Sequence, residues 1–504
     1  MFYLNRGRDA GRRGEVEWQL LEAGIEAHRF PAVDAGQVRN VRGYPDEKTR
    51  ARVVTQKLAI RKARRLGAEA VLLLEDDVRF HPNLPALLAK VQGKLPEDWN
   101  VLFLGCEHLE RPEVVTQGLV RVSKTRGTHA VVIRGEAFGE VLRALREGET
   151  LVSWAEGLQA EAYAAFPNLV WQGVKETDYE GRANCRYTEA GSGKEGLELD
   201  REVLREMVTG EREEREPKLG LLFLTRDDVN HPELWREWVA QAPEQVAVFA
   251  HAKNELSEES FLAGKEVSEH FETAWGEVGL VKATRALLRE ALADESVTHF
   301  MLLSEACLPI RPLGEILRRL QWNSRPQMRP RAFGKAPKHF AGRMAKAKDI
   351  PLACSRFTAQ WWLLDRTAAT MVMEEDYSDQ FAEVFASDEA YFGTVLKMSG
   401  YPLEDFVVAE EVTWTHWPKG AGSPQSHEVI EKKFLAEMVS SAALFARKFP
   451  PESDLPDSGL HLEFGKLSYP FSGGAYCPCH PTATSTGTAE PSSIFTWPCS
   501  TPYS

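Results

Sequence analysis

The chain of 504 residues lacks several features that would assign it to a common class of protein. No stretch approaches the roughly 20 consecutive apolar residues of a membrane helix, and the longest apolar runs, Val71–Leu74 and Leu219–Leu224, have the length of strands. Residues 1–13 contain no apolar core of a secretory signal. The seven cysteines lie mostly far apart, which excludes a disulfide framework. We therefore expect no transmembrane segment and a cytoplasmic, reducing location.

The chain also has fewer positively than negatively charged residues. The chain has 61 Lys and Arg against 74 Asp and Glu, a net charge of −13. A general nucleic-acid binder needs a basic face for phosphates, so we expect no nucleic-acid partner. The content of 43% hydrophobic and 27% charged residues is that of a globular protein. At this length we expect two or three domains, each with its own core.

Short apolar runs alternate with segments of helical period, which predicts largely parallel sheets covered by helices. Phe2–Leu4, Val71–Leu74 and Val101–Leu104 are predicted strands, the last closed by Gly105. The alternation restarts at Lys218, so the sequence predicts two α/β domains in tandem. The further predicted elements are the strands 246–250 and 300–303 and helices around Val16–Ala23, Leu84–Val91, Glu233–Val239 and Thr284–Leu292.

Two segments interrupt this alternation. Residues 191–217 contain 14 charged residues out of 27, with Leu199, Val203 and Met207 spaced by four, which predicts a solvated linker helix. Residues 452–504 form a tail. Within it, residues 467–504 carry one charged side chain, so we expect the tail to be disordered. A zinc site at Cys477-Pro-Cys479-His480 is disfavoured because the spacing is not that of a paired motif.

The sharpest local motif in the first half is Leu74-Glu75-Asp76-Asp77. Carboxylates that follow a buried strand lie at the carboxyl end of a parallel sheet, where open α/β folds bind ligands. In an extended backbone Glu75 and Asp77 face the same side, and two carboxylates suit a hard cation such as Mg²⁺ or Mn²⁺. Such a metal clamps a diphosphate and neutralises its charge. The alternative is an acidic turn that caps the following helix.

Several further blocks occur in the same order as in a known family. The chain opens with Tyr3-Leu4-Asn5-Arg6, and Phe30–Gly36, Asp98–Gly105 and Tyr163 to Asp178 follow the same order. Over residues 1–185 it thereby resembles family 25 glycosyltransferases, the lipopolysaccharide and collagen galactosyltransferase group. The resemblance implies a GT-A fold, a UDP-galactose-type donor and Mn²⁺. It places Asn5, Arg6 and Asp76 at the nucleotide and Glu75 and Asp77 at the metal, with Asp178 as a candidate catalytic carboxylate.

Two positions depart from that family. Thr55-Gln56 stands where a Ser-His pair is usual, and Ser153 stands where an Asp is frequent. Both positions are expected near the donor or the acceptor. Altered specificity or lost activity in this half therefore stays open.

Four polar blocks mark the second half. They are Phe223–Arg226, Leu302–Pro309, Ser387–Phe392 and Trp414–Gly420. Asp388 and Glu389 are expected to open an amphipathic helix, where an acid favours the helix dipole. Alternatively, a carboxylate near an acceptor hydroxyl is the general base of an inverting displacement, and Lys419 stabilises a departing diphosphate without a metal.

Together with Trp275-Gly276 and Gln360-Trp361-Trp362, these blocks resemble family 14 glycosyltransferases, the core-2/I-branching β-1,6-N-acetylglucosaminyltransferases and their plant and bacterial relatives. The resemblance covers about residues 218–450 and implies a GT-A-like, inverting, metal-independent enzyme. It makes Glu389 the catalytic base, with Asp388 as a second candidate, and places Arg226, Trp275 and Lys419 at the donor. Family members in animals and plants are usually anchored in the Golgi membrane, so the missing anchor favours a bacterial or viral soluble form.

The segment 316–348 contains ten Lys and Arg residues and no acid. We consider a mobile loop over the diphosphate, a contact for an acidic acceptor or a membrane surface, and a solvated loop. Cys307 and Cys354 pair only if the compartment is oxidising and their separation allows it. His416 is expected to be structural.

The sequence therefore predicts two GT-A-like, Rossmann-type nucleotide-sugar-binding domains in tandem, at residues 1–190 and 218–451, joined by 191–217 and followed by the tail 452–504. The leading hypothesis is a bifunctional glycosyltransferase that uses UDP-sugars, galactose-type first and N-acetylglucosamine- or xylose-type second, on a glycan, glycolipid or glycoprotein acceptor. In the alternative, only the second domain is active and the first binds a nucleotide or glycan. A non-catalytic interaction protein on two inherited scaffolds is the third hypothesis.

Overall fold

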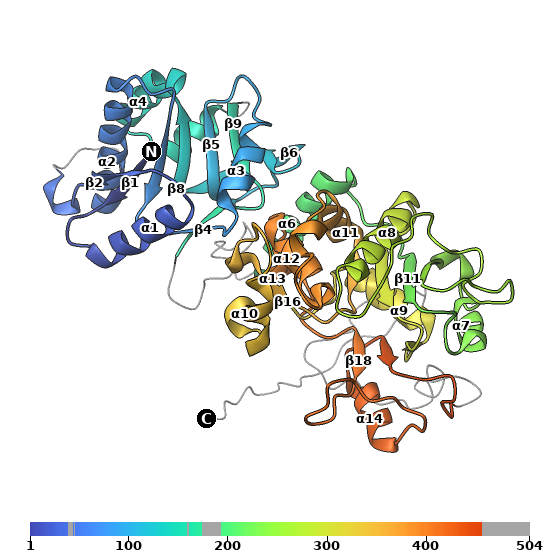
Figure 1. Ribbon diagram of the computed structural model, residues 1–504. Helices are drawn as coiled ribbons and strands as arrows, with labels where there is room; N and C mark the ends of the chain where they lie inside the picture. Colours follow the sequence, from blue (N-terminus) through green and yellow to red (C-terminus); the bar gives the residue numbers. More distant parts are fainter. Residues whose placement is uncertain (39–43, 45, 159–160, 174–192, 456–504) are drawn as a thin grey trace, which may run out of the picture. The chain divides into compact units, whose positions relative to one another are not determined.

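The computed structural model describes residues 1–38, 44, 46–158, 161–173 and 193–455 (Figure 1). The chain divides into two compact units, Met1–Gly465 and Lys466–Ser504. Everything described belongs to the first unit. The predictions for Asp178, for the cysteines of the tail and for its disorder beyond residue 455 lie outside the described residues.

The first half is built on an eight-stranded sheet in the order β2-β1-β3-β8-β5-β9-β7-β6. Strands β1, β2 and β3 are parallel to one another, as are β5 and β9, but β8 runs antiparallel between β3 and β5. The sheet is therefore mixed rather than largely parallel as predicted. The strands are β1 (Phe2–Asn5), β2 (His28–Pro31), β3 (Ala70–Glu75), β5 (Val101–His108), β6 (Glu113–Thr116), β7 (Leu119–Arg121), β8 (Thr125–Arg134) and β9 (Ala162–Ala165).

The second half is built on a four-stranded sheet in the order β12-β11-β13-β17. Its first three strands in this order are parallel and the edge strand β17 is antiparallel. These strands are β11 (Leu219–Thr225), β12 (Val246–Ala252), β13 (His299–Leu303) and β17 (Leu363–Asp365). Smaller sheets pair β4 (Val78–Phe80) with β10 (Val170–Gln172), β15 (Arg331–Ala332) with β16 (Arg356–Phe357), and β14 (Leu308–Pro309) and β18 (Thr413–Thr415) with β19 (Phe445–Arg447).

The two sheets share a backbone plan. In each, the first strand of the half lies between the second and the third, and the neighbour beyond the third strand is antiparallel. The strand ends match in detail: Ala32 donates its backbone N–H to the Asn5 carbonyl at 3.0 Å, and Lys253 donates to the Thr225 carbonyl at 3.0 Å. Two sheets of similar plan thus follow one another along the chain within one compact unit, and the predicted division into two domains stays a prediction.

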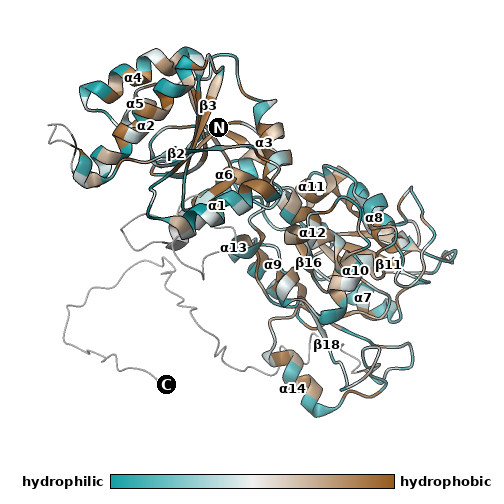
Figure 2. Ribbon diagram, turned by 60° about the vertical axis from the view of Figure 1, so that its left-hand side comes forward, coloured by the Kyte–Doolittle hydropathy of each residue, from teal (hydrophilic) through white to brown (hydrophobic). Residues whose placement is uncertain are grey.

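The helices that cover the sheets bury one face each. In α4, for example, Phe138, Val141, Leu142 and Leu145 recur at helical spacing and are buried, and the outer helices carry both hydrophilic and hydrophobic residues (Figure 2). No helix in the described part of the chain has the length and apolarity to cross a membrane. The helices are α1 (Ala10–Glu22), α2 (Glu47–Arg65), α3 (Leu84–Gln92), α4 (Phe138–Glu147), α5 (Leu151–Leu158), α6 (Gly193–Thr209), α7 (Pro232–Val239), α8 (Gly279–Ala293), α9 (Leu313–Trp322), α10 (Lys338–Met344), α11 (Arg366–Met373), α12 (Tyr391–Met398), α13 (Leu403–Phe406) and α14 (Lys432–Ser440).

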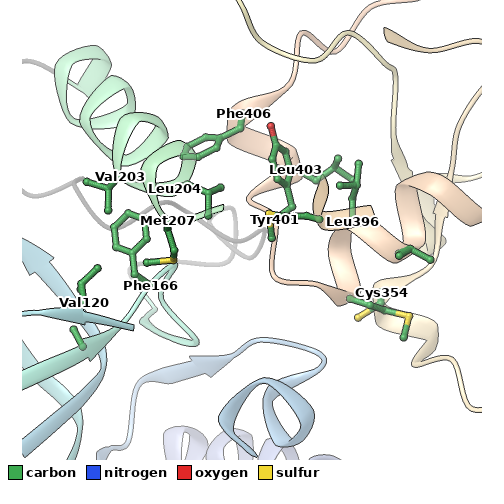
Figure 3. Packing of buried hydrophobic residues seen from close by; sticks show 14 of the residues in the cluster. Val120, Phe166, Val203, Leu204, Met207, Cys354, Leu396, Tyr401, Leu403 and Phe406 are labelled. Carbon is green, nitrogen blue, oxygen red and sulfur yellow. The ribbon is translucent and has the colours of Figure 1, made fainter. Parts of the chain in front are cut away.

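The predicted linker helix exists as α6, but it is packed rather than solvated. Val203, Leu204 and Met207 are at most 8% exposed. They belong to one apolar cluster with Phe166 of the first half and Tyr401 of the second (Figure 3). The charged face of α6 is used in ion pairs, such as that of Arg111 with Glu206 at 2.6 Å, so its charge does not make it a free spacer.

Two further predictions were wrong in detail. Gly105 does not end its strand, because β5 continues to His108. A Cβ at Gly105 would lie 1.8 Å from the Val170 carbonyl oxygen, so the glycine permits a close backbone approach. The helix after Glu389, α12, is not amphipathic, because all of its residues from Tyr391 to Met398 are buried.

Candidate functional site

The acidic motif of the first half lies where it was predicted, but its backbone is not extended throughout. Glu75 is the last residue of β3, and Asp76 and Asp77 form the turn that follows. Both aspartates lie near Arg12, whose Nη1 is 3.5 Å from an Asp76 carboxylate oxygen and 3.6 Å from one of Asp77. The three carboxylates line one cleft of about 230 Å³ together with Arg6.

Burial makes the charge of Glu75 unfavourable. Desolvation, followed by repulsion from Asp77, raises the pKa of Glu75 to about 7, although Arg52 with its Nη1 at 4.0 Å partly opposes the shift. Glu75 Oε1 and Asp77 Oδ1 are buried and accept no hydrogen bond within the described residues. A positive group placed between the two side chains would relieve both the repulsion and the missing hydrogen bonds.

These two oxygens fit a divalent cation only in part. In the described part of the chain, no group of three or more His, Cys, Asp and Glu side chains is arranged to hold a metal ion. Glu75 and Asp77 would supply two oxygen ligands, and the others must come from a bound phosphate or from water, as is usual for Mg²⁺. The donor set therefore fits a cation that arrives with a diphosphate.

Asn5 and Arg6 end β1 beside this cleft, but they differ in access. Asn5 is only 1% exposed, and its amide donates to Asp76 at 2.8 Å while its carbonyl oxygen accepts from Arg29 at 3.1 Å. The structure thus gives Asn5 the role of holding Asp76, rather than a place in the cleft lining. Arg6 lines the cleft and donates to Asp9 at 2.6 Å.

The two positions that depart from the family 25 pattern are occupied by side chains with local structural partners. Thr55 lines the cleft, accepts from the Val33 backbone at 3.0 Å and donates to the Ala51 carbonyl at 2.8 Å. Gln56 is buried and donates to Thr128. Ser153 pairs with the backbone and side chain of the nearby Thr150 at the start of α5.

In the second half, Glu389 ends a single 3₁₀ turn, Ser387–Glu389, that follows Ala386. Ala386 has a φ of 50°, in the left-handed region that costs a non-glycine residue energy. Arg343 of α10 holds this turn, because its guanidinium donates to a Glu389 carboxylate oxygen at 2.9 Å and to the Ala386 carbonyl at 2.5 Å. The Glu389 side chain remains 32% exposed, so it is both oriented and accessible.

Asp388 is the buried member of the acidic pair. It is 7% exposed, and desolvation and repulsion from Glu389 raise its pKa to about 7. Its Oδ1 accepts no hydrogen bond within the described residues. The interpretation of Asp388 as a solvated first-turn acid is therefore wrong, and its burial makes Glu389 the better candidate for contact with substrate.

Trp275 is brought to Glu389 by way of Phe385. The ring centroids of Trp275 and Phe385 lie 5.1 Å apart in an edge-to-face contact. Trp275 is 80% exposed and Phe385 is 48% exposed. Gly276 makes this possible: its φ is 78°, and a Cβ there would lie 2.4 Å from the Phe385 ring. The Gly276 carbonyl accepts from the Ala386 N–H at 2.8 Å. An exposed aromatic pair thus adjoins the carboxylate, a surface suited to a sugar ring.

Arg226 and Lys419 are both exposed, at the end of β11 and in the turn after β18. Within the residues that the structure describes, we find no contact of either side chain with Glu389. Their predicted place at the donor stays a prediction.

The structure reveals two partly buried cations that the sequence analysis missed. Arg447 lies 4.3 Å over the Trp361 ring, and burial lowers its pKa. Burial and the neighbouring Arg447 charge lower the pKa of Lys448. Both are anchored at the end of β13, because the Phe449 N–H donates to the Ala306 carbonyl at 3.0 Å. In the sequence, these two cations could have been identified from the Arg-Lys pair that directly follows the apolar run Ala442–Ala446.

Other predicted residues have structural places. Trp362 is fully buried and Trp361 is 8% exposed beneath Arg447. His416 contacts the Phe434 ring at 4.6 Å, as expected for a structural histidine. Cys307 and Cys354 are free thiols in the buried core, so they are not paired in this structure.

Comparison with known proteins places a family domain on the second half. Residues 220–439 match the core-2/I-branching enzyme family. Glycosyltransferase BC10 of Oryza sativa subsp. japonica is 25% identical over 168 residues, which are 32% of this chain and 41% of that protein. The chain thus spans less than half of the length of this curated relative.

Two solved structures show only a faint likeness. The glycosyltransferase GlyE of Streptococcus pneumoniae TIGR4 has 10% identity and a TM-score of 0.20, covering 57% of this chain and 76% of that one. The bifunctional glycosyltransferase WbbM has 9% identity and a TM-score of 0.22, covering 69% and 76%. At these scores neither likeness carries an argument. The family match confirms the resemblance predicted for residues 218–450 and makes this region a domain of a glycosyltransferase family. The match does not extend into residues 1–190.

Proposed function

We propose that this core-2/I-branching domain, residues 220–439 of the chain, transfers a sugar from a UDP-sugar to a glycan acceptor with inversion at the anomeric carbon. The observation that carries the proposal is the exposed Glu389 carboxylate, held by Arg343 and adjoined by the Trp275–Phe385 pair. N-acetylglucosamine and xylose are the donor sugars that we favour, on the resemblance to family 14.

In the proposed reaction, the Glu389 carboxylate removes the proton from an acceptor hydroxyl as its oxygen bonds to the anomeric carbon. The bond between that carbon and the diphosphate breaks at the same time, and the electron pair leaves with the diphosphate. The Arg343 guanidinium orients Glu389, because it donates to the carboxylate at 2.9 Å and also holds the Ala386 carbonyl of the same turn. A base in the correct ionisation state contributes about 10²–10⁴-fold to such a step.

The leaving diphosphate needs compensating positive charge. Lys419 was the predicted source, and the partly buried Arg447 and Lys448 near the end of β13 are stronger candidates. Cations in a desolvated site stabilise developing negative charge more than exposed ones do. We therefore add Arg447 and Lys448 to the proposed donor site, beside Arg226 and Trp275.

We propose further that residues 1–190 form a second nucleotide-sugar-binding unit, with a galactose-type donor and Mn²⁺. Glu75 and Asp77 would hold the cation, with Asp76 and Arg6 beside the nucleotide and Asn5 holding Asp76. When bound, the cation supplies charge that neutralises the diphosphate. The unpartnered oxygens of Glu75 and Asp77 support this assignment.

A binding module without turnover is the second candidate for the first half. Two observations favour it: Arg12 and Arg52 already lie beside the carboxylates, and Thr55 is engaged by the backbone within the cleft. In that case the chain is a transferase with one active domain.

One screen tests both halves without knowledge of the acceptor. UDP release from UDP-galactose, UDP-N-acetylglucosamine, UDP-glucose and UDP-xylose is measured with Mn²⁺ and with EDTA, in the wild type, E75A/D77A and E389Q. We expect an EDTA-resistant activity that E389Q abolishes. A second activity, lost with EDTA and in E75A/D77A, would establish a working first half. Activity that neither variant changes would overturn the residue assignments.

A further inference from the structure

The basic segment 316–348 is well described in the structure, which sets aside the interpretation of a structureless loop. It runs from the second half of α9 through β15 to α10 and the turn after it. It contains ten Lys and Arg residues and no acid, in a chain whose net charge is −13. A charge imbalance of this size on one continuous segment calls for a compensating negative partner.

Acidic side chains of the protein compensate only part of this charge. Within the described residues, Glu315 pairs with Arg319, Glu383 with Lys348 and Glu389 with Arg343, and Glu411 interacts electrostatically with Arg329 and Arg331. Lys338 forms no ion pair within the described residues, and Lys346 shares Glu383 with Lys348, so this part of the segment keeps a positive excess.

Helix α10 carries part of this excess directly beside the candidate base. Its buried side chains Phe340 and Met344 pack inward, with Phe340 lying 5.6 Å from the Phe357 ring, while Arg343 reaches Glu389. Lys338 and Lys346 are exposed. Lys338 begins α10 and Lys346 follows two residues after its end, so along the chain both lie within about 10 Å of Arg343, which contacts Glu389. Both views place α10 beside β16 and α12 (Figures 1 and 2).

We propose that the acceptor is an anionic saccharide, bearing carboxylate or phosphate groups that bind Lys338 at the start of α10 and Lys346 just after its end. This inference rests on the proposed function, and it names the class of acceptor. The Trp275–Phe385 pair offers a stacking surface for a sugar ring beside Arg343, which lies 6.0 Å from the Phe385 ring centre and holds Glu389.

A membrane surface fits this face less well. The exposed residues at the middle of α10 are His339, Ala341 and Gly342, with no large apolar side chain among them. A helix that lies on a bilayer needs an apolar face that enters it. The cations of α10 therefore fit a dissolved or chain-borne anionic sugar better than a lipid headgroup layer.

Direct binding to the full chain tests the inference. The probes are tetragalacturonate and its neutral methyl ester, maltotetraose with and without a 6-phosphate, and phosphatidylcholine vesicles with one third phosphatidylserine. Calorimetry compares the wild type, K338E/K346E, and K432E/K433E, which reverses two exposed lysines of α14 outside the segment. Thermal denaturation verifies that each variant folds.

We expect the wild type to bind at least one charged probe about 10-fold or more tightly than its neutral form at low salt, with the difference shrinking as salt screens the charges. K338E/K346E loses this preference and K432E/K433E retains it. The carboxylate and phosphate arms identify which anion is preferred. Equal affinity for charged and neutral forms, or a preference that survives K338E/K346E, overturns the inference. Binding to the vesicles alone overturns it in favour of a membrane contact.

The proposed function is tested independently of this inference. UDP release by the wild type and its loss in E389Q do not depend on any acceptor. A protein that hydrolyses donor but ignores the charge of the saccharides keeps the proposed function and loses only the inference about its acceptor.

Discussion

In the first half of the molecule, β3 ends in Glu75 and continues into Asp76 and Asp77. At the matching place in the second half, β13 is followed by Ser304, Glu305 and Ala306. The two positions are matched by strand register. In the first half, Glu75 of β3 lies opposite Leu4 of β1. In the second half, extending the β11–β13 register one residue beyond the Phe223–Leu303 pair puts Ser304 opposite Leu224. The turn after the third strand thus carries three carboxylates in the first half, counting Glu75, and one, Glu305, in the second.

The positively charged side chains near the two edges also differ. Around the carboxylates of the first edge lie exposed arginines, whereas the second edge has the partly buried cations Arg447 and Lys448 close to Glu305. A site with surplus buried carboxylate suits a diphosphate that arrives with a cation. A site with partly buried cations suits the diphosphate alone. The comparison teaches that the shared scaffold fixes where a ligand binds, while a few side chains decide what accompanies it.

The largest effect that we expect is in the second half. Replacing Glu389 by Gln removes the proposed base while keeping its shape, so donor-dependent turnover should fall by about 10²–10⁴-fold. Single-turnover release of UDP measures it, with EDTA present throughout. E383Q is the matched control, because Glu383 is an exposed acid that pairs with Lys348. Turnover in E389Q equal to that of E383Q would remove Glu389 from the mechanism.

The next effect belongs to the first edge. E75Q/D77N removes the two proposed ligands, so the affinity for Mn²⁺ should fall by more than the roughly 10–100-fold that loss of a supporting residue costs. Calorimetric titration of Mn²⁺ in the presence of UDP reports it without any activity. Unchanged Mn²⁺ affinity in the double variant would mean that the two edges do not differ in metal use.

A smaller effect is expected from Arg343. R343Q removes the guanidinium that positions Glu389, so kcat should fall about 10-fold while the KM for the donor changes little. R343K keeps a donor at the same place and should restore part of kcat. A purely structural role for Arg343 would lower the melting temperature and leave the kcat of the folded enzyme unchanged.

The smallest effect concerns stability. The pKa of Asp388 is raised to about 7 by burial, so its neutral form is favoured in the folded state. This contribution is fully present below about pH 4 and is lost as the pH rises towards 7. D388N should therefore gain melting temperature relative to the wild type, by a few degrees, between pH 5 and pH 8.

The control for that prediction is D379N, since the Asp379 side chain is 89% exposed. E75Q should shift in the same direction as D388N, because burial also raises the pKa of Glu75 to about 7. A parallel pH dependence of D388N and the wild type would show that Asp388 is ionised in the folded protein across this range.

Much of the local structure could be predicted from the sequence. The apolar runs that became β1, β3, β11 and β13 lie where expected, and the helix stripes of α1, α3 and α8 follow the predicted period. The antiparallel β8 and β17 were not predicted, because strand direction depends on how the chain returns to the sheet. The continuation of β5 through Gly105 was missed for a similar reason, since it depends on the close approach of Val170.

The candidate site, too, could be predicted only in part from the sequence. The sequence alone determined the residues with chemistry at the strand ends and in the Asp388-Glu389 pair, because polar groups after apolar runs recur at the edges of α/β sheets. Only the tertiary structure decided that Asp388 is buried while Glu389 is accessible, that Arg343 from α10 holds Glu389, and that Arg447 lies over Trp361. The two contacts join residues 46 and 86 positions apart in the chain, and burial and ion pairing across such separations are properties of packing, which no local pattern records.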